Sequence, residues 1–183
     1  IMFLLFIIET FIRDILVERE DDKWRRMMFS PLKPMEFISA RVISGWVMGI
    51  AVYLAIVLFG LLVFKIDWGN YLYLFIFVTV TCCWIASFFA LLNSFFKNRN
   101  QAGAFTAPII LVFSAFGGSI ISLNQLPASF RWVSYITLNR WFIDGVDRIR
   151  SGIFPLIPFA VLFLSGLVLF LLASTFLKKR ITV

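Results

Sequence analysis

Long apolar stretches alternate with short polar segments along the 183-residue chain, and this alternation predicts the elements of the structure. Residues 42–64, for example, carry no charged side chain. A helix needs about 20 predominantly apolar residues to cross a bilayer. The pattern therefore predicts a bundle of about five transmembrane segments: a partial span at 1–16 and complete spans at 37–64, 71–96, 102–123 and 154–177.

Composition supports the same fold class. The chain is 61% hydrophobic and 15% charged, with a mean hydropathy of +0.95. A water-soluble domain would need more polar surface, so we predict an all-α integral membrane protein. The net charge of +7 is also typical of nucleic-acid binding, but the basic residues gather at the ends of the apolar segments. Such charges orient a protein in the bilayer, and we expect no nucleic-acid partner.

The basic residues also predict an orientation. Of the 17 Lys and Arg residues, twelve lie on the side that holds residues 17–36 and the C-terminus. The other side holds only Lys65, Arg131, Arg140, Arg148 and Arg150. By the positive-inside rule, the polar stretch and the C-terminus are expected in the cytoplasm. Because residues 1–16 are too short to complete a span, the sequence also leads us to expect another transmembrane helix upstream.

The only long polar run is VEREDDKWRRMMFSPLKPME at residues 17–36. Asp21 or Asp22 can cap a short helix over 23–29, and Ser30-Pro31 ends that helix and can begin the next. The apolar face of the short helix would hold Trp24, Met27 and Met28, and the basic face Lys23, Arg25 and Arg26. The residues alone leave two interpretations open, an interfacial loop and a docking site for a soluble partner.

A second unusual segment covers residues 124–153, where aromatic residues alternate with arginines. This pattern predicts short helices that dip into one membrane interface. Asp144 and Asp147 are close in sequence, but Asp144 and Arg148 are four residues apart, which favours a solvated ion pair over acid–base chemistry. Pro108 and the pair Gly117-Gly118 predict a kink in the preceding span.

Little in the sequence indicates catalysis or metal binding. Histidine is absent, and Cys82 and Cys83 are adjacent in an apolar helix, where neighbouring side chains point apart. Glu9 and Arg13 have the spacing of an ion pair near a helix end. Gly45 and Gly49 are spaced for the close approach of another helix.

These motifs resemble a known family. Glu18-Arg19-Glu20, followed by Trp24-Arg25-Arg26-Met27-Met28-Phe29-Ser30-Pro31, is similar to the E-R-E-x-G-T-x-x-R-L-L-x-S-P signature of ABC-2-type transporter permeases. Gly117-Gly118, then Leu126-Pro127 and the region from Thr137 to Trp141, resembles that family's G-G...L-P...P...W segment. Two departures occur, because Asp22-Lys23 replaces the usual Gly-Thr and Leu138-Asn139 replaces the usual Pro.

The resemblance implies a six-span fold, of which the first span and its loop are missing here, with an external re-entrant hairpin before the last span. It implies pairing with a second permease copy or a related subunit, and with ATPase subunits that dock on the cytoplasmic coupling helix. ATP and Mg would bind to those partners, since the chain contains no G-x-x-x-x-G-K-[ST] motif and is expected to bind no cofactor itself. The implied ATPase-coupling residues are Glu18, Arg19, Glu20, Trp24, Arg25, Arg26, Met27, Met28, Ser30 and Pro31, and the implied gate residues are Gly117, Gly118, Leu126, Pro127 and Trp141.

The sequence also bears on three other classes of membrane protein: an embedded enzyme, an ion-coupled carrier and a structural subunit. An embedded enzyme would need a reactive cluster, and an ion-coupled carrier would need ionisable groups near the middle of its spans. Neither is evident in the complete spans. A structural subunit without transport of its own stays an alternative to the exporter permease.

Overall fold

The computed structural model describes residues 1–20, 34–96, 98–121, 125 and 131–181, and every extended regular element in this part is helical. The predicted all-α membrane fold is thereby confirmed. The helices are α1 (Met2–Glu20), α3 (Pro34–Phe64), α4 (Tyr71–Ser94), α5 (Arg99–Phe116), α6 (Arg131–Ser134), α7 (Leu138–Arg150) and α8 (Leu156–Ile181). Among the described residues, three stretches are long and apolar enough to cross a membrane: Ser39–Phe64, Tyr71–Ser94 and Leu156–Phe176.

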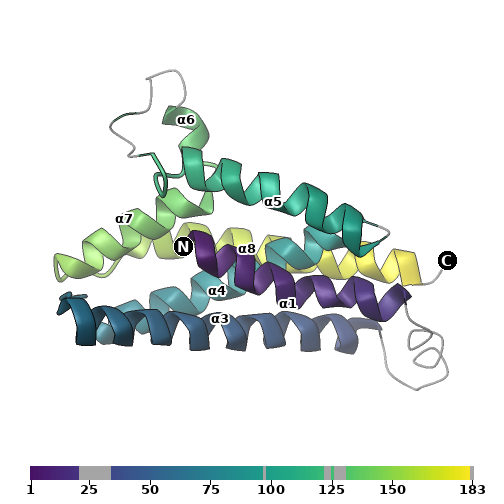
Figure 1. Ribbon diagram of the computed structural model, residues 1–183, viewed down its shortest axis with the longest axis horizontal. Coiled ribbons are helices and arrows are strands. Elements are labelled where there is room, and N and C mark those ends of the chain that lie inside the picture. Colours follow the sequence, from purple (N-terminus) through teal and green to yellow (C-terminus); the bar gives the residue numbers. More distant parts are fainter. Residues whose placement is uncertain (21–33, 97, 122–124, 126–130, 182–183) are drawn as a thin grey trace.

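Helix α4 is the centre of the bundle and packs against α1, α3, α7 and α8 (Figure 1). In its most apolar stretch 61% of the residues are buried, compared with 22% in α3 and α8. The side chain of Asn70 begins the helix, because its Oδ1 accepts hydrogen bonds from the backbone N–H groups of Leu72 and Tyr73. The outer faces of α3 and α8 are thus left for lipid or for partner subunits.

Two glycines bring α3 close to α1. A Cβ atom on Gly45 would lie 2.7 Å from Ile12 Cδ1, and one on Gly49 would lie 2.6 Å from Ile8 Cδ1 and 3.1 Å from Cys82 Sγ. A Cβ atom at either position would force the end of an isoleucine side chain on α1 to shift, so the two glycines favour the observed close packing of α1, α3 and α4.

The third complete span differs from its prediction. The apolar run 102–123 predicted a single helix, but α5 begins at Arg99, continues through Pro108 and ends at Phe116. The chain turns away at Gly117, and Gly118 adopts a φ of +91°, a conformation that favours glycine. The backbone N–H groups of Ser119 and Ile120 both donate to the carbonyl of Ser114, which closes the end of the helix.

Other boundaries also shift. Helix α1 continues from the predicted partial span through the first residues of the polar stretch to Glu20. Within 124–153 the short helices α6 and α7 are present, as the sequence predicts. The two predicted ion pairs are confirmed, Glu9 with Arg13 at 3.6 Å and Asp144 with Arg148 at 3.0 Å.

Helix α5 lies beside the C-terminal half of α4, and helix α7 lies beside its N-terminal half. Phe113 of α5 packs on Phe88 of α4, and Phe105 packs on Phe96, just after α4 ends; in each pair the ring centroids are 5.5 Å apart. The two helices are therefore antiparallel. Continuing the same offset places the end of α5, at Phe116, level with Ile85 near the middle of α4.

Helix α7 covers the other half of α4. Gly145 packs directly on the ring of Phe77, and the carbonyl of Ile149 lies against Gly69, just before α4 begins. This pair is also antiparallel, so Leu138, at the start of α7, is level with Trp84. In Figure 1, α5 and α7 accordingly follow one another along the long axis of the bundle, on the same side of it. Together they cover one side of the bundle, end to end along α4.

Candidate coupling and gating sites

A buried polar joint connects the end of α5 to the start of α7. Asn139, in the first turn of α7, is fully buried, and its Nδ2 donates to Ser119 Oγ at 2.9 Å and to Ser114 Oγ at 3.3 Å. Ser114 belongs to the last turns of α5 and is equally buried. A buried amide is costly unless it is hydrogen-bonded, so these contacts hold the end of α5 to the start of α7.

Gly117 makes the joint compact. A Cβ atom at this position would overlap the Cβ of Asn139 and would lie 2.8 Å from Thr137 Oγ1. The chain therefore needs glycine where the backbone of the α5 turn meets α7. The structure brings Gly117 against Thr137 and Asn139, so the two separate pieces of the implied gate motif meet at this point.

The remaining gate residues are placed in part. Trp141 Nε1 donates to the carbonyl of Tyr135 at 2.8 Å, and Arg140 lies over the Tyr135 ring, 4.0 Å from its centroid, while donating to Ser134 Oγ. These contacts fasten the turn between α6 and α7. Leu126 and Pro127 lie outside the described residues.

One atom at the joint has no partner. Asn139 Oδ1 is buried and accepts no hydrogen bond from any described residue. The other end of the amide is paired, because Nδ2 donates to the hydroxyl oxygens of Ser114 and Ser119. A buried acceptor left unpaired costs about 1–3 kcal/mol, so the joint is held less tightly than a fully satisfied polar network would be.

A second polar contact connects α1 to α5. Glu9 is 3% exposed, and its Oε1 accepts a 3.1 Å hydrogen bond from Thr106 Oγ1 in addition to its ion pair with Arg13. A Cβ atom on Gly103 would lie 2.6 Å from Arg13 Nη1, so the guanidinium also lies directly on α5. The pair that the sequence indicated as a helix-end salt bridge is thus a buried contact between two helices.

The predicted ATPase-coupling residues lie at or beyond the end of the same helix. Glu18, Arg19 and Glu20 are the last residues of α1. The others, Trp24, Arg25, Arg26, Met27, Met28, Ser30 and Pro31, lie outside the described residues. Because α1 is a continuous helix, it connects the start of the coupling motif to the Glu9 contact with α5.

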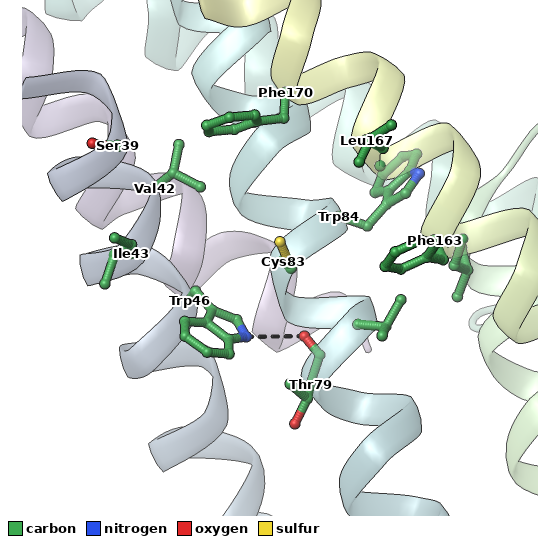
Figure 2. A pocket seen from close by; sticks show the side chains of 13 residues that line it. Ser39, Val42, Ile43, Trp46, Thr79, Cys83, Trp84, Phe163, Leu167 and Phe170 are labelled. Carbon is green, nitrogen blue, oxygen red and sulfur yellow. Dashed lines mark hydrogen bonds between the residues drawn. The ribbon is translucent and has the colours of Figure 1, made fainter. Parts of the chain in front are cut away.

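An apolar groove opens between α3, α4 and α8 and has a volume of about 410 Å³ (Figure 2). Two tryptophans are fixed in its walls. Trp46 Nε1 donates to the carbonyl of Thr79 at 3.0 Å, and Trp84 Nε1 donates to Ser165 Oγ at 2.8 Å. Sequence patterns did not indicate this groove, because its lining residues look like ordinary span residues.

The described residues contain no group of three or more His, Cys, Asp or Glu side chains that could hold a metal ion. Cys82 and Cys83 are both free, the first buried and the second exposed toward the groove. The arrangement offers contacts between helices and an apolar groove, and the described part gathers no reactive cluster suited to covalent chemistry.

Comparison with known proteins agrees with this arrangement. The family model described as "ABC-2 family transporter protein" matches residues 1–175, nearly the whole chain. No curated protein and no solved structure gives a match.

Proposed function

The chain belongs to the ABC-2 transporter family and is a membrane permease subunit of an ABC transporter, and from this premise we propose that it moves its substrate outward, driven by a separate ATPase subunit. ATP and Mg would bind to that ATPase, and the permease itself would supply the pathway and the moving helices. A second copy or a related permease would complete the membrane part.

The observation that supports this proposal most is the contact of Glu9 and Arg13 with α5. Helix α1 carries the start of the coupling motif at one end and this buried contact along its length. A displacement of the 17–36 region by ATP-driven closure would therefore be passed through α1 to α5.

The same displacement would reach the outer half of the membrane domain through the joint. Helix α5 ends at Phe116, and there Ser114 and Gly117 meet Asn139 of α7. In our proposal α7 and α6 form the external gate, and the unpaired Oδ1 of Asn139 leaves the joint able to rearrange at small cost. The gate would then open when α5 moves relative to α4.

The proposal is tested by charge reversal in the coupling motif. Arg25→Glu and Arg26→Glu should lower ATPase association and transport in a reconstituted complex while leaving expression and topology intact. Met27→Asp should do the same, since an unpaired charge in an apolar contact costs several kcal/mol.

The matched control places the same reversals at Lys178 and Lys179, which lie at the end of α8. These variants should bind the ATPase as the unmodified permease does. If both sets leave ATPase binding and transport unchanged, residues 17–36 are an ordinary interfacial loop, and a structural subunit becomes the better assignment.

A further inference from the structure

The groove between α3, α4 and α8 is bounded entirely by residues of the three candidate spans. Its walls include Ile43 and Trp46 from α3, Cys83 from α4, and Phe163 and Phe170 from α8 (Figure 2). Its volume of about 410 Å³ falls within the range of small-molecule pockets, about 300–1,000 Å³. The groove therefore has room for a bound molecule at membrane depth.

The lining presents almost nothing for a polar ligand. The Ser39 hydroxyl donates to the carbonyl of Glu36, and the Thr79 hydroxyl donates to the carbonyl of Phe75. The indole N–H groups of Trp46 and Trp84 are engaged within the protein as well. Ligand pockets usually hold a few convergent polar groups that fix orientation, and their absence from these walls indicates a hydrocarbon occupant.

The depth of the groove indicates where this hydrocarbon comes from. Thr79 and Cys83 lie near the middle of α4, whereas Ser39 is the first residue of the α3 span and lies at the membrane surface on the C-terminal side. The groove thus extends from the headgroup region of one leaflet toward the bilayer centre. An acyl chain of a lipid in that leaflet has this position and direction.

Charge indicates the headgroup. Lys178, Lys179 and Arg180 follow directly after the α8 span, which contributes one wall of the groove. Clusters of basic residues next to a span attract anionic lipids electrostatically. We propose that the groove between α3, α4 and α8 binds one acyl chain of an anionic phospholipid from the leaflet on the C-terminal side. This site is independent of the ATPase coupling proposed above.

Photolabelling tests the site directly. The full-length permease would be placed with its ATPase in bilayers containing phosphatidylglycerol that carries a diazirine midway along one acyl chain, and the adducts would be mapped by mass spectrometry. We expect adducts concentrated on the groove walls of α3 and α8. Adducts spread evenly over all exposed faces of these helices, or crosslinks to a second permease copy in place of lipid adducts, would overturn the proposal.

A matched pair of variants separates groove binding from general lipid contact. Ile43 and Val47 are one helical turn apart on α3 and are 52% and 54% exposed, but only Ile43 lines the groove. Ile43→Trp should lower groove labelling about tenfold. Each methylene kept out of the site weakens binding about fourfold, and the larger side chain is expected to exclude between one and two of them. Val47→Trp should leave it unchanged, and equal effects of the two variants would refute the site.

The headgroup is tested with the same probe on phosphatidylcholine. Phosphatidylglycerol should label the groove more strongly, and neutralising Lys178, Lys179 and Arg180 together should remove the difference. Equal labelling by the two lipids in the unmodified protein would refute the preference for an anionic headgroup. If the groove is not labelled by either lipid but Arg25→Glu clearly lowers ATPase binding, the lipid site is overturned and the proposed function stays intact.

Discussion

Thr106→Val removes one hydroxyl from the contact between α1 and α5 and leaves the size of the side chain nearly unchanged. Thr106 is 1% exposed, and its single hydroxyl proton is shared between the carbonyl of Ala102 at 2.8 Å and Glu9 Oε1 at 3.1 Å, a carboxylate that is itself 3% exposed. Hydrogen bonds between membrane helices contribute about 0.6 kcal/mol on average and up to about 1.7 kcal/mol. Because the acceptor carries charge and is buried, we expect a loss of about 1.7 kcal/mol in the free energy of unfolding.

The chain contains a closely matched control. Thr81 is also fully buried, and its hydroxyl donates to the carbonyl four residues earlier, as that of Thr106 does. Within the described part of the chain, this hydroxyl makes no hydrogen bond to another helix. Thr81→Val should therefore change the free energy of unfolding by less than about 0.5 kcal/mol.

Equilibrium unfolding in mixed detergent micelles measures both variants. Thr106→Val should lower the unfolding midpoint by about 3–7 °C for a chain of this length. In a Glu9→Gln background the same substitution should cost only about 0.6 kcal/mol, since the acceptor is then neutral. Equal costs for Thr106→Val and Thr81→Val would refute the assigned contact between α1 and α5.

Three further predictions concern other parts of the fold. Gly117→Ala should destabilise the protein by about 1–3 kcal/mol in the same unfolding assay, because the added methyl group overlaps the Cβ of Asn139 across the joint. Single cysteines would be placed at Asn98 and Ser151 in a background lacking the natural cysteines. An impermeant thiol reagent should reach position 98 only from the cytoplasmic side and position 151 only from the other side. Reaction of both positions from the same side would contradict the topology taken from charge. Asp144→Asn should change stability by less than about 0.5 kcal/mol, since the ion pair with Arg148 is over 40% exposed on both sides, and a larger loss would show that this pair is structural.

Hydropathy was sufficient to predict the three helices that can cross a membrane. Helices α3, α4 and α8 contain long uncharged runs, and their length alone makes them spans. The ion pairs of Glu9 with Arg13 and Asp144 with Arg148 also followed from spacing, because a helix brings residues four apart together whatever surrounds it.

The end of α5 could not be predicted in the same way. Residues 102–123 are apolar throughout, and the helix ends at Phe116 because Gly117 meets Asn139, a contact between positions far apart in the sequence. Asn139 stood out only as a replacement for the family's usual proline, with no signal that it bonds to Ser114 and Ser119. Likewise, the burial of Glu9 depends on Thr106 on another helix, which no local pattern contains.

The meeting of α5 and α7 at Asn139 also affects how freely the length of the chain between them can vary. The end of one helix and the start of the next are held together by Ser114, Ser119 and Asn139, whatever the number of residues between Ile121 and Arg131. Lengthening that stretch adds only a small closure entropy, because each doubling of a loop costs about 0.6 kcal/mol. We therefore expect insertions between Ile121 and Arg131 to leave the contacts of Asn139 with Ser114 and Ser119 in place.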